Sequence, residues 1–142
     1  MYETFKFLHS YWAYLVLVDL IIATANAVCK FFGYKEFDAK DFRISLFALI
    51  TMHIQLLIGI ILYFTRGYFD ENSIGEVMKN DSLRKLAVEH PTTMIIAVAL
   101  VTIGYSKHKK KLTSHPKFKM LAIFYTIALL LLLSRIPWAS WL

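Results

Sequence analysis

Four long apolar stretches constrain the fold of this chain more than any other feature. They cover approximately residues 7–28, 42–65, 90–106 and 118–136. Each has about 20 residues, enough for a helix to cross about 30 Å of hydrocarbon. Backbone N–H and C=O groups in lipid must bond within their own segment, so each stretch is expected to be a helix. The sequence therefore predicts an all-α integral membrane four-helix bundle, with residues 1–142 forming a single domain.

The composition is typical of a membrane protein. Of the 142 residues, 58% are hydrophobic, which leaves too little polar surface for a soluble domain of this size. A net charge of +6 would suggest nucleic acid as the partner of a soluble chain, but here the charges lie between the apolar stretches. We therefore expect a lipid bilayer and no nucleic acid as partner. Cys29 is the single cysteine; it excludes an internal disulfide and is expected to be an inert packing residue.

The polar connections predict the orientation of the bundle. Four spans place both termini on one side and the first and third turns on the other. Those two turns hold most of the basic residues: Lys30, Lys35, Lys40, Arg43, Lys107, Lys109, Lys110, Lys111, Lys117 and Lys119. The positive-inside rule places them in the cytoplasm. We therefore predict a multi-pass protein of the bacterial inner membrane, with both termini on the periplasmic side.

Residues 66–89 form the longest connection. We expect them to form short helices that lie along the outer surface of the inner membrane, on the periplasmic side. Ser73 and Glu76 have the spacing of a capping box for the first helix. Asp81 or Ser82 is expected to cap the second. In the basic third turn, His108 and His115 are predicted to be solvated.

Ionisable residues inside membrane spans are rare, so each is a functional candidate. They are His9, Asp19, His53 and His90, with Arg135 at the edge of the last span. At a rise of about 1.5 Å per residue, His9 and His90 lie near the outer face, within roughly 6 Å of one another in height. Both belong to rows with alternating steps of four and three that face the bundle interior. These rows are His9, Trp12, Val16, Asp19, Ala23 and Asn26, and His90, Met94, Ala97, Val101 and Gly104.

Two imidazoles on facing helices at one height predict a haem b with His9 and His90 as its axial ligands. Its propionates would point toward Arg135, Arg84 or Arg66. Glu89 would orient a neighbouring histidine or the ligand itself. The small residues on these rows let helices approach closely, or leave room for a flat cofactor. The alternative is that each histidine simply forms hydrogen bonds at the membrane interface.

Other roles remain open for His53 and Asp19. His53 is the alternative ligand opposite His90, although it lies deeper by roughly 10 Å. Asp19 and His53 are expected at similar depth near the middle of the membrane, as a structural pair or as a proton relay. A metal site made of His9, His53 and His90 is a further alternative. No nucleophile triad, phosphate loop or pair of catalytic carboxylates is present, so independent catalytic activity is not expected.

The whole chain resembles a family of small four-span membrane proteins of Bacteroidetes described as cytochrome B-like. The resemblance rests on His9-Ser10-Tyr11-Trp12, Thr51-Met52-His53-Ile54-Gln55-Leu56-Leu57-Ile58-Gly59, Glu89-His90-Pro91, Ile103-Gly104-Tyr105-Ser106-Lys107-His108-Lys109 and Ser134-Arg135-Ile136-Pro137-Trp138. It implies a haem-associated or respiratory membrane protein.

The chain is also similar to one four-helix half of haem A synthase, through His9, Gln55 with Gly59, and His90. This likeness favours His9 over His53 as the ligand opposite His90. The glutamate that this family has before its first histidine is replaced by Lys6, and the outer-loop cysteine pair is absent. The likeness therefore implies haem binding rather than haem oxidation.

The function predicted from the sequence is that of a b-type haem-binding membrane protein. It would transfer electrons, or serve as a haem-bearing subunit of a larger respiratory complex or of a homo-oligomer. The alternative is a haem-free accessory subunit that packs against a larger membrane complex. A proton-coupled carrier that uses Asp19 and His53 is a third hypothesis.

Overall fold

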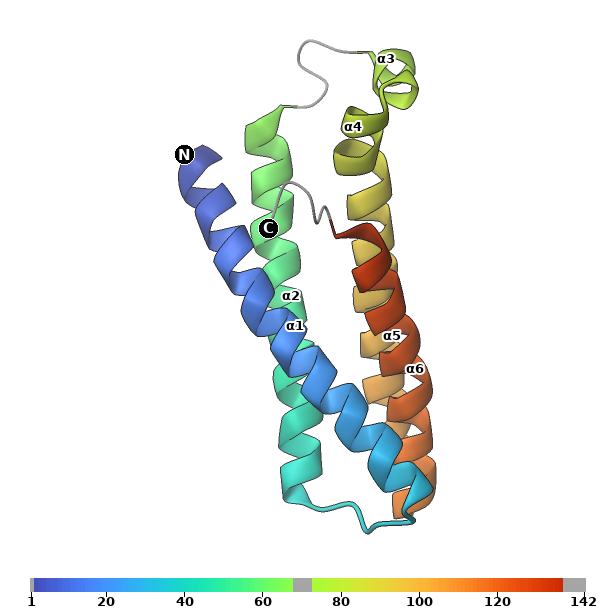
Figure 1. Ribbon diagram of the computed structural model, residues 1–142. Helices are drawn as coiled ribbons and strands as arrows, with labels where there is room; N and C mark the ends of the chain where they lie inside the picture. Colours follow the sequence, from blue (N-terminus) through green and yellow to red (C-terminus); the bar gives the residue numbers. More distant parts are fainter. Residues whose placement is uncertain (1, 68–72, 137–142) are drawn as a thin grey trace.

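The protein is a bundle of four long helices in the computed structural model, which describes residues 2–67 and 73–136 (Figure 1). The long helices are α1 (Tyr2–Phe32), α2 (Ala39–Arg66), α5 (His90–Lys110) and α6 (Ser114–Arg135). Each is long and apolar enough to cross a membrane, α5 being counted together with the short helical turns that precede it. No strand occurs in the described ranges. The predicted all-α membrane bundle is confirmed.

Helix α2 begins about one turn before its apolar stretch, and local capping groups define both of its ends. The Asp38 side chain accepts hydrogen bonds from the backbone N–H groups of Lys40 and Asp41 at the start of α2, and Asp41 returns a bond to the N–H of Asp38. This is a capping box. At the other end of α2, Gly67 adopts a left-handed φ of 66°, and its N–H bonds to the carbonyl of Tyr63.

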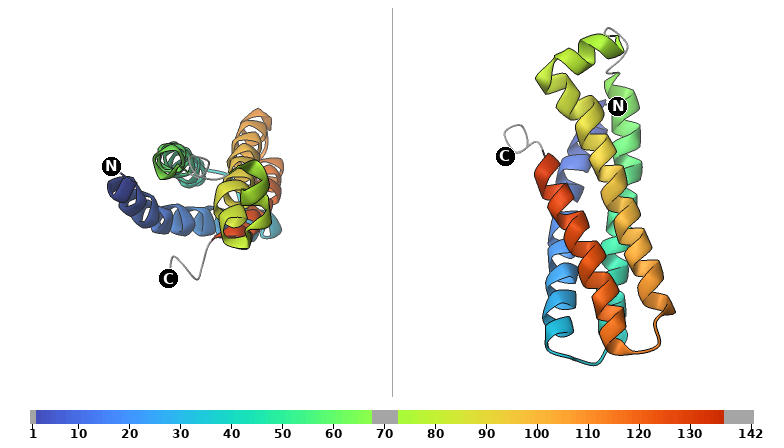
Figure 2. Two further views of the ribbon diagram at one scale, coloured as in Figure 1. Left: turned by 90° about the horizontal axis from the view of Figure 1, so that it is seen from above. Right: turned by 90° about the vertical axis from the view of Figure 1, so that its right-hand side faces the viewer.

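The connection between α2 and α5 contains α3 (Ile74–Lys79), α4 (Asp81–Arg84) and a π-helical turn, η1 (Lys85–Glu89). Figure 2 shows α3 and α4 lying over the end of α5. Ser73 caps α3 as predicted, because its hydroxyl accepts from the N–H of Glu76 at 3.2 Å. The predicted cap of α4 is wrong: Asn80, not Asp81 or Ser82, accepts from the N–H of Leu83 at 3.1 Å. An asparagine side chain fills this role as well as an aspartate.

Residue 1 and the segments 68–72 and 137–142 lie outside the described residues. The first of the two segments belongs to the predicted surface connection. The second includes Pro137 and Trp138, which contribute to the family resemblance.

The buried side chains of α1 and α2 gather in the half nearer the two short turns, whereas Val77, Ala87 and Leu132 are buried toward the other end. In α1 they run from Val16 to Ala27, and in α2 from Asp41 to Met52. The predicted interior rows contribute Val16 and Ala23 of α1 and Ala97 and Val101 of α5 to this core. Asp19, predicted to face the interior with them, instead lines a groove between α1 and α2. At the other end of the bundle, the described parts of α1 before Val16 and of α2 after Met52 have no fully buried side chain. That end is packed less tightly.

Gly104 allows α5 and α6 to come close together. A Cβ atom at Gly104 would lie 2.4 Å from Cβ of Phe124, a distance that real Cβ contacts do not reach. The small residues were predicted either to let helices approach closely or to leave room for a cofactor, and Gly104 has the first of these roles. It permits close helix packing and does not make room for a cofactor.

Candidate functional site

His9 of α1 and His90, the first residue of α5, meet at the loosely packed end of the bundle. Their ring centroids are 6.2 Å apart and the ring planes are inclined by 82°. An ion bound by one nitrogen of each ring, at about 2 Å from each, places the two centroids roughly 6 Å apart. The structure thus brings together the two histidines that the depth argument selected, at a separation that suits one shared metal ion.

His90 is held by the end of α6. Its Nδ1–H donates a hydrogen bond of 2.9 Å to the backbone carbonyl of Arg135. A carbonyl can only accept, so the proton lies on Nδ1 and the lone pair on Nε2. This is the arrangement of most metal-bound histidines, in which the second nitrogen is fixed by a hydrogen bond.

His9 is positioned by α2. The side-chain N–H of Gln55 donates to the backbone carbonyl of His9 at 2.9 Å. A Cβ atom at Gly59 would lie 3.3 Å from Cε1 of the His9 ring, so the absence of a side chain at Gly59 makes room for the imidazole. Nδ1 of His9 is buried and has no hydrogen-bond partner in the described ranges, and the same holds for Oε1 of Gln55. A buried polar atom of this kind needs an explanation, and a bound group is one.

Two arginines share the carboxylate of Glu89, the residue that precedes His90. Nε of Arg84 is 2.9 Å from one oxygen of Glu89, and Nε of Arg135 is 3.7 Å from the other. Arg84 also bonds to Asp81 and to the carbonyl of Met78. Glu89 thus contacts the arginines, and among the described residues no contact to an imidazole supports its predicted role in orienting a histidine. Arg84 and Arg135, two of the three arginines predicted to bind propionates, lie at the His90 end of α5.

His53 and Asp19 lie on different sides of α2. Nδ1 of His53 is 2.8 Å from the carbonyl of Leu49 and Nε2 is 3.3 Å from the hydroxyl of Thr102 on α5. Asp19 lines a groove between α1 and α2, and His53 is not among the residues of that groove. The contacts of the described residues thus do not bring this pair together. They also place His53 against Thr102, away from the paired rings of His9 and His90.

The three-histidine metal site is not formed. In the part of the chain that the structure describes, no three residues drawn from His, Cys, Asp and Glu come together in a way that could hold a metal ion. The depth argument gives the reason, because His53 lies deeper in the membrane than the other two histidines.

The prediction that His108 is solvated is wrong. His108 is fully buried, and its Nδ1–H donates to the carbonyl of Tyr105 one turn earlier. The rings of Phe37 and Phe42 lie 5.5 and 6.1 Å away, centroid to centroid. These aromatic rings come from the first turn and the start of α2, so the sequence around His108 gives no sign of them.

Two further predictions near the turns are wrong. His115, expected in solvent, is stacked between Phe31 and Tyr34, with ring centroids 4.3 and 4.4 Å away. Cys29, expected to pack within the chain, is exposed on the surface of α1.

A buried polar cluster at the first turn was missed by sequence reasoning. Asp41 is fully buried, and one of its oxygens accepts from Lys30 at 2.6 Å and from Asn26 at 2.9 Å. Ser45 extends the cluster, because its carbonyl accepts from the hydroxyl of Tyr125 on α6 at 2.9 Å. The sequence carries one signal of this cluster. Asn26 and Lys30 are about one helical turn apart near the end of α1, and Asp41 lies in the first turn of the next helix.

The site that the structure assembles is therefore the pair His9 and His90, supported by Gln55, Gly59 and the carbonyl of Arg135. The resemblance to the cytochrome B-like family and to haem A synthase stays a prediction from the sequence. Comparisons of the chain with family models, with curated proteins and with solved structures found no match.

Proposed function

We propose that this membrane bundle binds one b-type haem, with His9 and His90 as its axial ligands. The observation that carries the proposal is the pairing of the two imidazoles, 6.2 Å apart and nearly perpendicular. Haem iron held by two imidazoles carries one electron at a time and has no open coordination position for a substrate. An electron-transfer role follows from that chemistry, either in this chain alone or in a larger respiratory complex of the inner membrane.

The surroundings of each histidine support the proposal. The carbonyl of Arg135 fixes His90 with its Nε2 lone pair available. Gly59 leaves space beside His9, and the buried Nδ1 of His9 has no partner in the described ranges. The fully buried core of α1 and α2 lies at the other end of the bundle. A flat cofactor at this end would therefore displace little close-packed core.

The charges at the periphery also suit a haem. Arg84 and Arg135 both lie within ion-pair reach of Glu89. Guanidinium groups bind carboxylates in a planar, two-bond geometry, so these side chains are suited to hold propionates at the membrane surface. Glu89 keeps the two arginines together at the start of α5.

The test is a reduced-minus-oxidised optical spectrum of the purified full chain, recorded as isolated and again after addition of haemin. A Soret band with the sharp bands of a six-coordinate low-spin haem supports the proposal. A protein with no Soret band in either sample overturns it. In that case, stable co-purification with a large membrane complex would favour the accessory-subunit alternative.

A further inference from the structure

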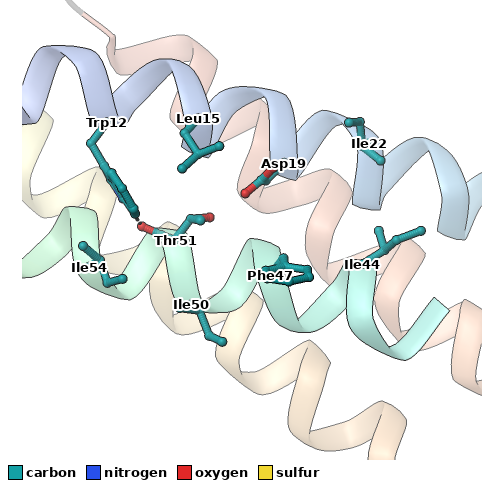
Figure 3. A pocket seen from close by; sticks show the side chains of 9 residues that line it. All are labelled: Trp12, Leu15, Asp19, Ile22, Ile44, Phe47, Ile50, Thr51 and Ile54. Carbon is teal, nitrogen blue, oxygen red and sulfur yellow. Dashed lines mark hydrogen bonds between the residues drawn. The ribbon is translucent and has the colours of Figure 1, made fainter. Parts of the chain in front are cut away.

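A groove runs between α1 and α2 on the outer surface of the bundle (Figure 3). It has a volume of about 520 Å³, within the range of roughly 300–1,000 Å³ that is typical of small-molecule sites. Its walls are mostly apolar. The groove is lined by Trp12, Leu15, Asp19, Ile22, Ile44, Phe47, Ile50, Thr51 and Ile54.

A carboxyl group lies at the centre of this groove. Figure 3 shows Asp19 pointing from α1 toward Thr51 of α2. Asp19 lies roughly 20 Å along the helix from Phe32, the end of α1 at the first turn, and is therefore near the middle of the membrane. No Lys, Arg or His lines the groove, and no ion pair of Asp19 is formed in the described ranges. Thr51 is the polar side chain that it meets.

A carboxyl group at this depth is costly unless another group donates to it or carries a complementary charge. The hydroxyl of Thr51 lies within hydrogen-bonding reach of Asp19, but its single proton also serves the carbonyl of Ala48 at 3.1 Å, so most of the acceptor capacity of the carboxyl group is left open. The remaining acceptor capacity of Asp19 therefore points to a donor from outside the chain. A donor that reaches the middle of the membrane must itself be soluble in lipid.

The walls of the groove specify the rest of such a molecule. Trp12 and Phe47 place two aromatic rings along it, and aromatic groups stack favourably on such rings. The Trp12 indole N–H is already used, in a bond of 2.9 Å to the carbonyl of Thr51 that fixes the ring. The isoleucines at both ends suit an apolar tail.

We propose that this groove binds a membrane-soluble phenol or quinol. A ring hydroxyl donates to the carboxyl of Asp19, the ring packs against Trp12 or Phe47, and the tail lies along the isoleucines. The site is separate from the histidine pair, since neither His9 nor His90 lines the groove. The inference therefore does not depend on haem.

The experiment measures quenching of Trp12 fluorescence in lipid nanodiscs, with Trp138→Phe and Trp141→Phe present so that Trp12 is the sole tryptophan. The probe is a decyl-chain hydroquinone. The matched ligand control is its dimethyl ether, which has the same ring and tail but no donor. Asp19→Leu removes the acceptor, and Ile50→Phe fills the groove while leaving Asp19 in place and Trp12 as the sole tryptophan. Ile95→Ala, on the exposed face of α5, is the protein control.

The hydroquinone should bind the parent protein at least tenfold more tightly than the dimethyl ether. Both groove substitutions should remove that preference, and Ile95→Ala should preserve it. Equal binding of hydroquinone and ether to the parent overturns the proposal. This outcome is measured on the parent protein alone, so it does not depend on whether a variant folds. A crosslink between the grooves of two copies of the chain also overturns the proposal if it still forms in excess hydroquinone. In that case the groove is a contact surface between two protein copies.

Discussion

Lys30, in the last turn of α1, and Asp41, in the first turn of α2, form an ion pair of 2.6 Å across the first turn. Asp41 is fully buried, whereas the Lys30 side chain is 30% exposed. Removing one partner of a buried pair leaves an uncompensated charge and costs about 3–5 kcal/mol. Because Lys30 is partly exposed to water, we predict a smaller loss for Lys30→Met, about 2 kcal/mol of unfolding free energy.

The measurement for this prediction is thermal or denaturant unfolding of the purified protein in detergent. Lys40→Met is the matched control, since the Lys40 side chain is exposed and lies in the same turn. If both variants unfold like the parent, the ion pair contributes nothing to stability and the buried carboxylate is held by Asn26 and the backbone alone.

Gly104→Ala should destabilise the contact between α5 and α6. The added methyl group would meet Cβ of Phe124 at 2.4 Å, and that atom is fixed to the backbone, so the helices must separate. Overpacking of this kind costs about 1–3 kcal/mol. Gly75→Ala is the control, because the nearest atom to its new Cβ would be 3.9 Å away. The melting temperature in detergent should fall for the first variant only, and an equal shift in both would contradict the packing argument.

His9→Ala and His90→Ala should each abolish the low-spin haem spectrum, and His53→Ala should leave it unchanged. The physical reason is that the rings of His9 and His90 lie next to one another, 6.2 Å apart, while the nitrogens of His53 lie against Leu49 and Thr102. Optical spectra of the three variants, recorded at equal protein concentration after haemin addition, provide the measurement. Loss of the spectrum in His53→Ala alone would reassign the second ligand to His53.

The fold could be predicted from the sequence because lipid leaves the backbone few choices. The four apolar stretches became the four long helices, and interior rows such as the one through Ala97 and Val101 became the core. The exact ends could not be predicted in this way, since Asp38 and Gly67 extend α2 through local hydrogen bonds. Hydropathy does not detect such caps.

The site could be predicted only in part. Depth arithmetic placed His9 and His90 together, and the periodicity of α2 explains why His53 is elsewhere. Met52 is buried in the core, so the next residue is rotated by about 100° toward the helix surface. The burial of His108 depends on Phe37 and Phe42, which are distant in sequence. Contacts of that kind become visible only in three dimensions.

Gly59→Val should change the properties of the bound haem without removing it. A single Cβ at Gly59 already lies 3.3 Å from Cε1 of His9, and the two further methyl groups of valine would push the imidazole away from α2. The His9 ring would rotate or tilt while His90 keeps its hydrogen bond to Arg135. The electronic structure of a bis-imidazole haem depends on the orientation of its ligands. We therefore predict a shifted electron paramagnetic resonance spectrum and midpoint potential with haem still bound. Ile58→Val, next to it on α2, is the control and should leave both unchanged. If Gly59→Val gives the parent spectrum and potential, His9 is not a ligand.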